Sequence, residues 1–310
     1  MSISKISPFA FAAYATSLLL ACGDSTTAAP DAHQHEHDAH HEVDAPPAPI
    51  AVTIPFVARV KGTAFACDQV YTGVGSTDAS YTGQDFRFFV SDVALIPAGG
   101  GTPVPVTLTV NSNQAANGLA LLDFENGTGA CQMGTTATYT SIVGTVPAGT
   151  YNGVTFTMGV PEAQNHIDPA GAPGPLNTTG IASGMSWNWR GGYKFAKIEG
   201  KITGGNVPAF NLHLGSTGCV GPEANLPPTA PCTNSHRVAA NLTGFTLGTS
   251  KIVADVGPVL AGADLKVNTP MTAPGCMSFP GDTDCNTIFP QLGLAFEGNA
   301  ALPQSFFKVE

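Results

Sequence analysis

Glycine and proline constrain the fold of this chain more than any other feature of its sequence. The 310 residues include 36 glycines and 25 prolines, close to a fifth of the chain. Both residues favour turns and interrupt helices. No long stretch has the period-3.6 pattern of a helical bundle or coiled coil. The chain is therefore expected to form many turns and few long helices.

Short apolar segments from residue 50 onward predict an all-β fold. In residues 104–110, four apolar side chains alternate on one face: Val104, Val106, Leu108 and Val110. Residues 139–146 and 151–160 are two further strands, and the turn 147–150 is expected to join them as a hairpin. Many short strands with Gly-rich turns predict an antiparallel β-sandwich or open barrel.

The N-terminus has the sequence of a bacterial lipoprotein signal. Lys5 gives a basic start, an apolar run follows, and Leu19-Leu20-Ala21-Cys22 forms a lipobox. Residues 1–21 are therefore predicted to be a signal peptide, with a lipid on the Cys22 thiol. The mature protein would be anchored to a membrane of the bacterial cell envelope, facing the periplasm or the cell surface. The alternative is an ordinary secretory signal followed by a buried cysteine.

Residues 22–50 are expected to be a disordered tether, because they contain almost no large apolar side chains. Five histidines lie on it: His33, His35, His37, His40 and His41. Neutral imidazole suits copper and zinc, so the tether is predicted to be an auxiliary, loose metal site. A solvated linker of low complexity is the alternative.

Residues 51–310 are expected to form a single domain, with residues 258–310 as a loop-rich C-terminal appendage. The formal charge is −10 and no basic cluster is present, which argues against nucleic acid as a partner. No G-x-S-x-G motif, P-loop or placeable Ser/His/Asp set occurs, so nothing indicates an enzyme.

Six cysteines follow Cys22, and an even number in an exported chain predicts disulfides. They are Cys67, Cys131, Cys219, Cys232, Cys276 and Cys285. Six cysteines allow fifteen connectivities. Pairing of near neighbours gives Cys219–Cys232 and Cys276–Cys285, and leaves Cys67–Cys131. No C-x-x-C is present, which disfavours a metal site made from these cysteines.

Two histidines and both tryptophans of the folded part are candidates for chemistry. A lone histidine on a strand, such as His213, is more often a core residue than a ligand, and His166 follows a strand end. Trp187 and Trp189 lie on one predicted strand and are expected to point to the same face. Core packing is the ordinary use of two such aromatic side chains.

Several motifs occur in order across roughly residues 52–256. They are Leu121-Leu122-Asp123-Phe124-Glu125 with Gly129-Ala130-Cys131, Val146-Pro147-Ala148-Gly149-Thr150-Tyr151, Gly159-Val160-Pro161 with Asn165-His166, Pro175-Leu176-Asn177, the W-x-W segment 185–195, and His213-Leu214-Gly215-Ser216-Thr217-Gly218-Cys219. Together they resemble the MbnP-like family, also described as the metallo-mystery pair, four-Cys motif family. The family's four cysteines would fall on Cys67, Cys131, Cys219 and Cys232.

The resemblance implies a copper-binding protein without turnover of its own. Its partner would be a dihaem enzyme of the MauG/MbnH and cytochrome c peroxidase type, which oxidises a tryptophan to kynurenine. The implied ligands of the copper, expected as Cu(I), are His166, His213 and a kynurenine made from Trp187 or Trp189. Asp168 would orient His166. The competing hypothesis is a structural or adhesive surface lipoprotein with no metal role.

Overall fold

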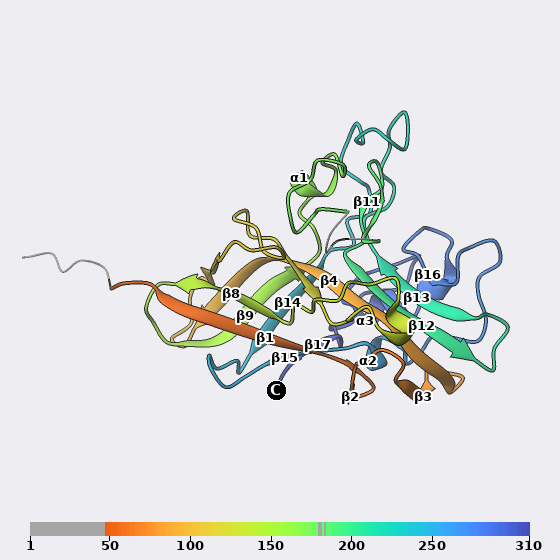
Figure 1. The fold of residues 1–310 in the computed structure, drawn as a ribbon, viewed down its shortest axis with the longest axis horizontal. Coiled ribbons are helices and arrows are strands. Elements are labelled where there is room, and N and C mark those ends of the chain that lie inside the picture. Colours follow the sequence, from red (N-terminus) through yellow and green to blue (C-terminus); the bar gives the residue numbers. More distant parts are fainter. Residues whose placement is uncertain (1–46, 179–181, 183) are drawn as a thin grey trace, which may run out of the picture. The chain divides into compact units, whose positions relative to one another are not determined.

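The computed structural model describes residues 47–178, 182 and 184–310. The predicted signal peptide, the lipidation site Cys22 and the five tether histidines lie outside these described residues. Within them the all-β prediction is confirmed (Figure 1), and no helix is long and apolar enough to cross a membrane. The helical segments are short: η1 (Gly129–Cys131), α1 (Glu162–Asn165), α2 (Val256–Leu260), η2 (Thr283–Cys285) and α3 (Ile288–Gln291).

The first sheet has the strand order β17-β15-β1-β8-β6, with β2 paired to β1. Its central strand alternates between buried and more exposed side chains, and Val52, Ile54 and Phe56 point into the core. The strands are β1 (Ile50–Val60), β2 (Thr63–Ala64), β6 (Thr107–Leu108), β8 (Ser141–Val146), β15 (Ile252–Asp255) and β17 (Phe307–Val309).

The second sheet has the order β14-β9-β4-β12-β13-β16, and β3, β5 and β7 also pair with β4. The long strand β4 is therefore its spine. The strands are β3 (Val70–Val74), β4 (Ala79–Pro97), β5 (Val104–Pro105), β7 (Ala120–Asp123), β9 (Tyr151–Met158), β12 (Ala196–Thr203), β13 (Ala209–Leu214), β14 (Val238–Thr243) and β16 (Gly275–Cys276). A separate hairpin consists of β10 (Ser186–Asn188) and β11 (Gly192–Tyr193).

The hydrophobic core lies between the two sheets. Phe56 of β1 contacts Phe88 of β4 and Phe156 of β9, with ring centroids 6.2 and 5.6 Å apart. Phe307 of β17 packs on the same rings, 5.6 Å from Phe88 and 4.9 Å from Phe156. The expectation that residues 258–310 form an appendage is therefore wrong, because β16 and β17 complete the two sheets.

Two expectations about strand neighbours also need correction. The turn 147–150 does not close a hairpin: β8 pairs with β1 and β6, whereas β9 pairs with β4 and β14. The connection crosses from one sheet to the other. The sheets are not wholly antiparallel either, since β1 runs parallel to β15 and β13 parallel to β16. Alternation identifies the buried face of a strand and does not select its neighbour.

The cysteines form the three disulfides that near-neighbour pairing gives. They are Cys67–Cys131, Cys219–Cys232 and Cys276–Cys285. The first ties the segment between β2 and β3 to η1, and the last joins β16 to η2. The second joins the segments that follow β13 and precede β14, which brings it beside the helix α1.

Candidate metal centre

The W-x-W segment is an antiparallel hairpin separate from both sheets. Trp187 lies on β10, but β10 ends at Asn188 and Trp189 belongs to the turn that leads to β11. The Asn188 side chain accepts a hydrogen bond of 2.6 Å from the Gly191 amide and closes this turn. The expectation that both indoles share one strand face is therefore wrong, and each indole has its own surroundings.

Trp187 packs against the segment that follows β13. A Cβ atom on Gly215 would lie only 2.5 Å from Cη2 of Trp187, which accounts for the first glycine of the His-Leu-Gly-Ser-Thr-Gly-Cys motif. On another side the ring of Phe279 lies 5.6 Å away, centroid to centroid. Trp187, His213 and Lys194 line the same pocket of about 750 Å³. The sequence-predicted pair Trp187 and His213 thus shares one cavity.

His213 stands on β13 and is held by a carboxylate of the neighbouring strand. Its Nε2 lies 2.7 Å from Oε1 of Glu199, so Nε2 carries the proton that it donates. Burial lowers the pKa of His213, which favours the neutral imidazole with Nδ1 as the lone pair. Although burial raises the pKa of Glu199, the hydrogen bond from His213 and the charge of Lys197 bring it down to about 2.

A row of ionisable side chains continues from His213 into the protein. Asp123, Arg87, Lys197 and His213 occupy opposite positions on β7, β4, β12 and β13. Asp85 accepts hydrogen bonds from both Arg87 and Lys197, the second at 2.5 Å. These buried charges compensate one another, as buried charges must. Sequence patterns missed the row, because its members come from separate strands.

His166 follows α1, and its neighbours determine which ring nitrogen carries the proton. The Tyr193 amide donates to Oδ1 of Asn165, so Nδ2 of Asn165 faces His166 and donates to Nε2 at 3.0 Å. The Nδ1 atom lies 3.3 Å from the carbonyl oxygen of Trp189, which can only accept. These contacts place a proton on Nδ1 of His166 and make Nε2 the acceptor of the hydrogen bond from Asn165.

Gly192 allows Asn165 to occupy this position. A Cβ atom on Gly192 would lie 2.5 Å from Nδ2 of Asn165, and the φ of Gly192 is +74°. A glycine meets both requirements at no steric cost. The second glycine of the Trp-Arg-Gly-Gly-Tyr sequence is thereby linked to the orientation of His166.

Trp189 and His166 bind each other through two hydrogen bonds. Nε1 of Trp189 donates to the His166 carbonyl oxygen at 2.8 Å, and Nδ1 of His166 donates to the Trp189 carbonyl oxygen. The indole of Trp189 also lines a pocket of about 390 Å³ together with Asp168 and Asn225. The sequence-predicted pair Trp189 and His166 is thus in direct contact.

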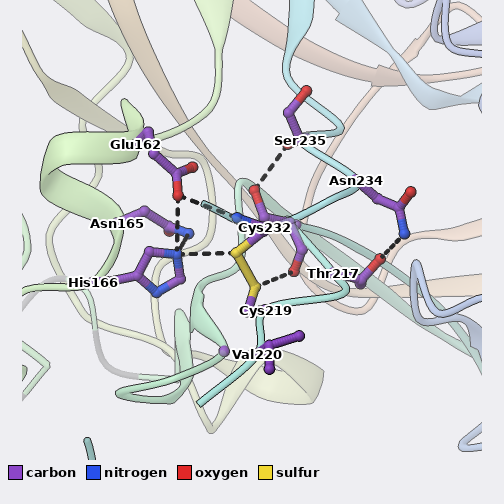
Figure 2. Close-up of a disulfide and its surroundings, with 12 residues drawn as sticks. Glu162, Asn165, His166, Thr217, Cys219, Val220, Cys232, Asn234 and Ser235 are labelled. Atoms are coloured by element: carbon purple, nitrogen blue, oxygen red, sulfur yellow. Dashed lines mark hydrogen bonds and ion pairs between the residues drawn. A yellow bond between two sulfur atoms is a disulfide. The ribbon is translucent and has the colours of Figure 1, made fainter. Parts of the chain in front are cut away.

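A disulfide and a carboxylate lie next to Nε2 of His166 (Figure 2). Sγ of Cys232 lies 3.2 Å from Nε2, and Oε1 of Glu162 lies 3.7 Å from it. Nε2 of His166 and the sulfur atoms of Cys219 and Cys232 all lie within 4.8 Å of one another. Sequence reasoning treated these two cysteines as structural and missed Glu162, which only the start of α1 brings here.

The sequence-predicted residues fall into two groups around the W-x-W hairpin. His166 has Trp189 as its neighbour, His213 has Trp187, and the described polar contacts of the two imidazoles share no residue. The ligand set of both histidines and a kynurenine stays a prediction. Asp168 is not among the described hydrogen-bond partners of His166; it accepts a bond from the Ala170 amide.

Comparisons with known proteins agree with this architecture. A family model described as MbnP matches residues 49–278. The solved structure of MbnP from Methylosinus trichosporium is similar with a TM-score of 0.73 and 28% sequence identity, and the match covers 84% of this chain and 98% of that one. A comparison with curated proteins gives no match. Because the family model covers most of the chain, including the W-x-W and His-Leu-Gly-Ser-Thr-Gly-Cys segments, this chain belongs to the MbnP family.

Proposed function

We propose that this protein is an extracytoplasmic copper-binding lipoprotein with no turnover of its own. Its copper, as Cu(I), is held by His166 and His213 together with a kynurenine that a MauG-like dihaem partner makes from a tryptophan. Membership of the MbnP family supports the metal-related role. The lipid anchor on Cys22 and the envelope location remain part of the proposal.

One observation carries the proposal: His166 has the orientation of a metal ligand. Ligating histidines usually donate the other ring N–H to a carbonyl or carboxylate, which fixes the tautomer and aims the free nitrogen at the metal. His166 does this through the Trp189 carbonyl oxygen, and Nε2 is the acceptor nitrogen, whose hydrogen bond from the Asn165 amide a metal ion would replace. Neutral imidazole nitrogen is a donor that suits copper.

Trp189 is the tryptophan that we propose as the source of the kynurenine. Its indole lines an open pocket beside exposed residues such as Ala224 and Asn225, so a docked protein can approach it. Two molecules of peroxide, each reduced to water, supply the two oxygen atoms that cleave the C2–C3 double bond of the indole; hydrolysis of the resulting N-formyl group releases formate, and an aryl amine remains. This amine starts at the position of Nε1, next to the backbone of His166.

His213 enters the proposal as the second imidazole. Its Nδ1 lone pair is free because Nε2 donates to Glu199. Trp187 lines the same pocket and is the alternative source of the kynurenine. Single-residue variants therefore test each half of the ligand set separately.

The experiment is co-expression with the dihaem partner, followed by intact mass, peptide mapping and copper analysis. We expect the mass of kynurenine at residue 189 and one tightly bound copper per chain. W189F should lack the kynurenine absorbance and bind copper more weakly, whereas W187F should retain both. H166A and H213A should each lose the tight copper and keep the fold.

Two results would overturn parts of this proposal. Kynurenine at residue 187 with an unmodified Trp189 would reassign the oxidised tryptophan. Co-expressed protein with neither kynurenine nor copper would leave the structural or adhesive surface lipoprotein as the better hypothesis.

A further inference from the structure

We infer that Cys219, Cys232 and His166 form a reduction-gated site for one soft metal ion, with Cu(I) as the favoured ion. In the oxidised protein the two sulfur atoms are bonded to each other. Reduction converts them into two thiol ligands beside an imidazole. This site goes beyond the proposed function, because it requires no kynurenine and no dihaem partner.

The positions of the three donor atoms support the site. Nε2 of His166 and both sulfur atoms lie within 4.8 Å of one another. Metal–sulfur bonds of about 2.3 Å and metal–nitrogen bonds of about 2.0 Å place neighbouring ligands of one ion roughly 3.5–4 Å apart. Nε2 of His166 is therefore already near both sulfur atoms, which have to move apart once their bond is broken. Figure 2 shows the imidazole facing the disulfide.

Nε2 of His166, the acceptor nitrogen of the ring, lies on the side of the sulfur atoms. The Asn165 amide and the Trp189 carbonyl oxygen hold the proton of His166 on Nδ1. Nε2 then faces Sγ of Cys232 at 3.2 Å. An imidazole held in this tautomer needs no proton transfer before it binds an ion, and only the hydrogen bond from the Asn165 amide to Nε2 has to be released.

The backbone keeps the two cysteines together when the disulfide is open. Thr217 and Asn234 exchange two backbone hydrogen bonds of 3.0 and 3.1 Å. The Asn234 side chain adds a third, to the hydroxyl of Thr217. Each of these residues lies two positions from one of the cysteines, so the bridge holds both segments independently of the sulfur–sulfur bond.

A dithiol reductant can reach this disulfide. Cys219 is half-buried and lines a surface pocket of about 200 Å³, whereas Cys276, Cys285 and Cys131 are fully buried. A thiolate of the reductant attacks Sγ of Cys219, the sulfur–sulfur bond breaks, and Cys232 leaves as a thiolate. The second thiol of the reductant then releases Cys219, so the reductant gives two electrons and becomes a disulfide. Binding of the ion displaces the thiol protons.

The donor set favours Cu(I) over harder ions. Thiolate sulfur is a soft ligand that selects Cu(I) and zinc. A fourth donor for tetrahedral zinc would have to be Glu162, whose other carboxylate oxygen is bound by Arg237 at 2.9 Å. Cu(I) is satisfied by three ligands and leaves this ion pair intact.

The test uses full-length protein made without the dihaem partner. The protein is reduced with a phosphine and titrated anaerobically with Cu(I) in the presence of bicinchoninate as a competing chelator. We expect one Cu(I) per chain to be withheld from the chelator after reduction and none before it. Alkylation and peptide mapping should find free thiols at Cys219 and Cys232, and not at Cys276 and Cys285.

Variants separate the site from unspecific thiol binding. H166A should be reduced as readily as the parent and lose more than about tenfold in Cu(I) affinity. The double variant C219S/C232S should keep its circular dichroism spectrum and lose the site. E223Q changes an exposed carboxylate in the loop between the cysteines and should bind like the parent.

The inference is overturned if reduction adds no Cu(I) site, if H166A binds like the parent, or if C219S/C232S unfolds. Failure of the proposed function has a different signature. In that case the oxidised protein that has met the dihaem partner binds no copper, whatever the reduced protein does.

Discussion

Single side chains in this protein acquire their chemistry from neighbours that are distant in sequence. His166 and His213 carry a proton on different ring nitrogens: His166 presents Nε2 and His213 presents Nδ1, because different acceptors take their protons. The motifs identified both histidines as candidates. They could not show which nitrogen is free, since Trp189 and Glu199 reach the rings only through the fold.

Gly192→Ala should weaken copper binding without touching a ligand. The new Cβ would meet Nδ2 of Asn165, and a positive φ is unfavourable for alanine. Displaced Asn165 would release His166 from its tautomer. We expect an affinity for copper at least about tenfold lower and a loss of about 1–3 kcal/mol in the free energy of unfolding. Gly204→Ala is the control, because it has a similar φ and open space around it; equal effects of the two variants would contradict the role of Asn165.

Glu199 should govern part of the acid stability of the fold. Its pKa is about 2 in the folded protein, against 4.5 for the ordinary side chain. A carboxyl with a depressed pKa adds stability that is fully present above pH 4.5 and is lost as the pH falls towards 2. E199Q should therefore lower the free energy of unfolding at pH 7 by about 1–3 kcal/mol. It should also flatten the decline between these pH values, as measured by urea unfolding. An unchanged pH profile would show that another group titrates there.

At the scale of the elements, the end of strand β10 determines where the two indoles of the W-x-W segment lie. Two residues apart on one strand, Trp187 and Trp189 would point to the same face. They do not, because β10 ends at Asn188 and Trp189 lies beyond it. The turn then sends one indole to His213 and the other to His166. Spacing in the sequence predicted the strand but not its last residue, which depends on the bond between Asn188 and Gly191.

The disulfides should differ in their contribution to stability according to the loops that they close. Cys67–Cys131 spans 64 residues and Cys276–Cys285 spans 9. By the chain-entropy estimate, removal of the first costs about 4 kcal/mol and removal of the second about 2.5 kcal/mol. Urea unfolding of C67A/C131A and C276A/C285A measures both. A larger loss in C276A/C285A would mean that packing of the buried sulfurs outweighs the loop entropy.

At the scale of the whole molecule, the sequence was sufficient to predict the fold class but not which strands pair with each other. Short apolar segments separated by Gly-rich turns were enough to predict the all-β class. The crossing between β8 and β9 and the parallel pairing of β1 with β15 could not be predicted, because period-two patterns carry no information about partners. The same limit applied to the site, where Glu162 and Cys232 meet His166 only in three dimensions.

The tether prediction can be tested on the complete chain. Deletion of residues 31–44 removes all five tether histidines. We expect the variant to lose its weak copper and zinc sites and to retain one tight copper, as measured by competition with a chelator. If the tight copper disappears with the deletion, the histidine tract is the functional element and the folded site is not.

The parallel pairing of β1 with β15 has a consequence for how the chain is made. Phe56 lies opposite Ile252, and β15 in turn pairs with β17, where Ile252 meets Val309. Strand β1 is made long before β15 and β17, so its sheet stays incomplete until both of these strands have been synthesised. Contacts between such distant positions form slowly. A ribosome-bound chain that stops before residue 307 lacks β17 and leaves the outer edge of β15 unpaired.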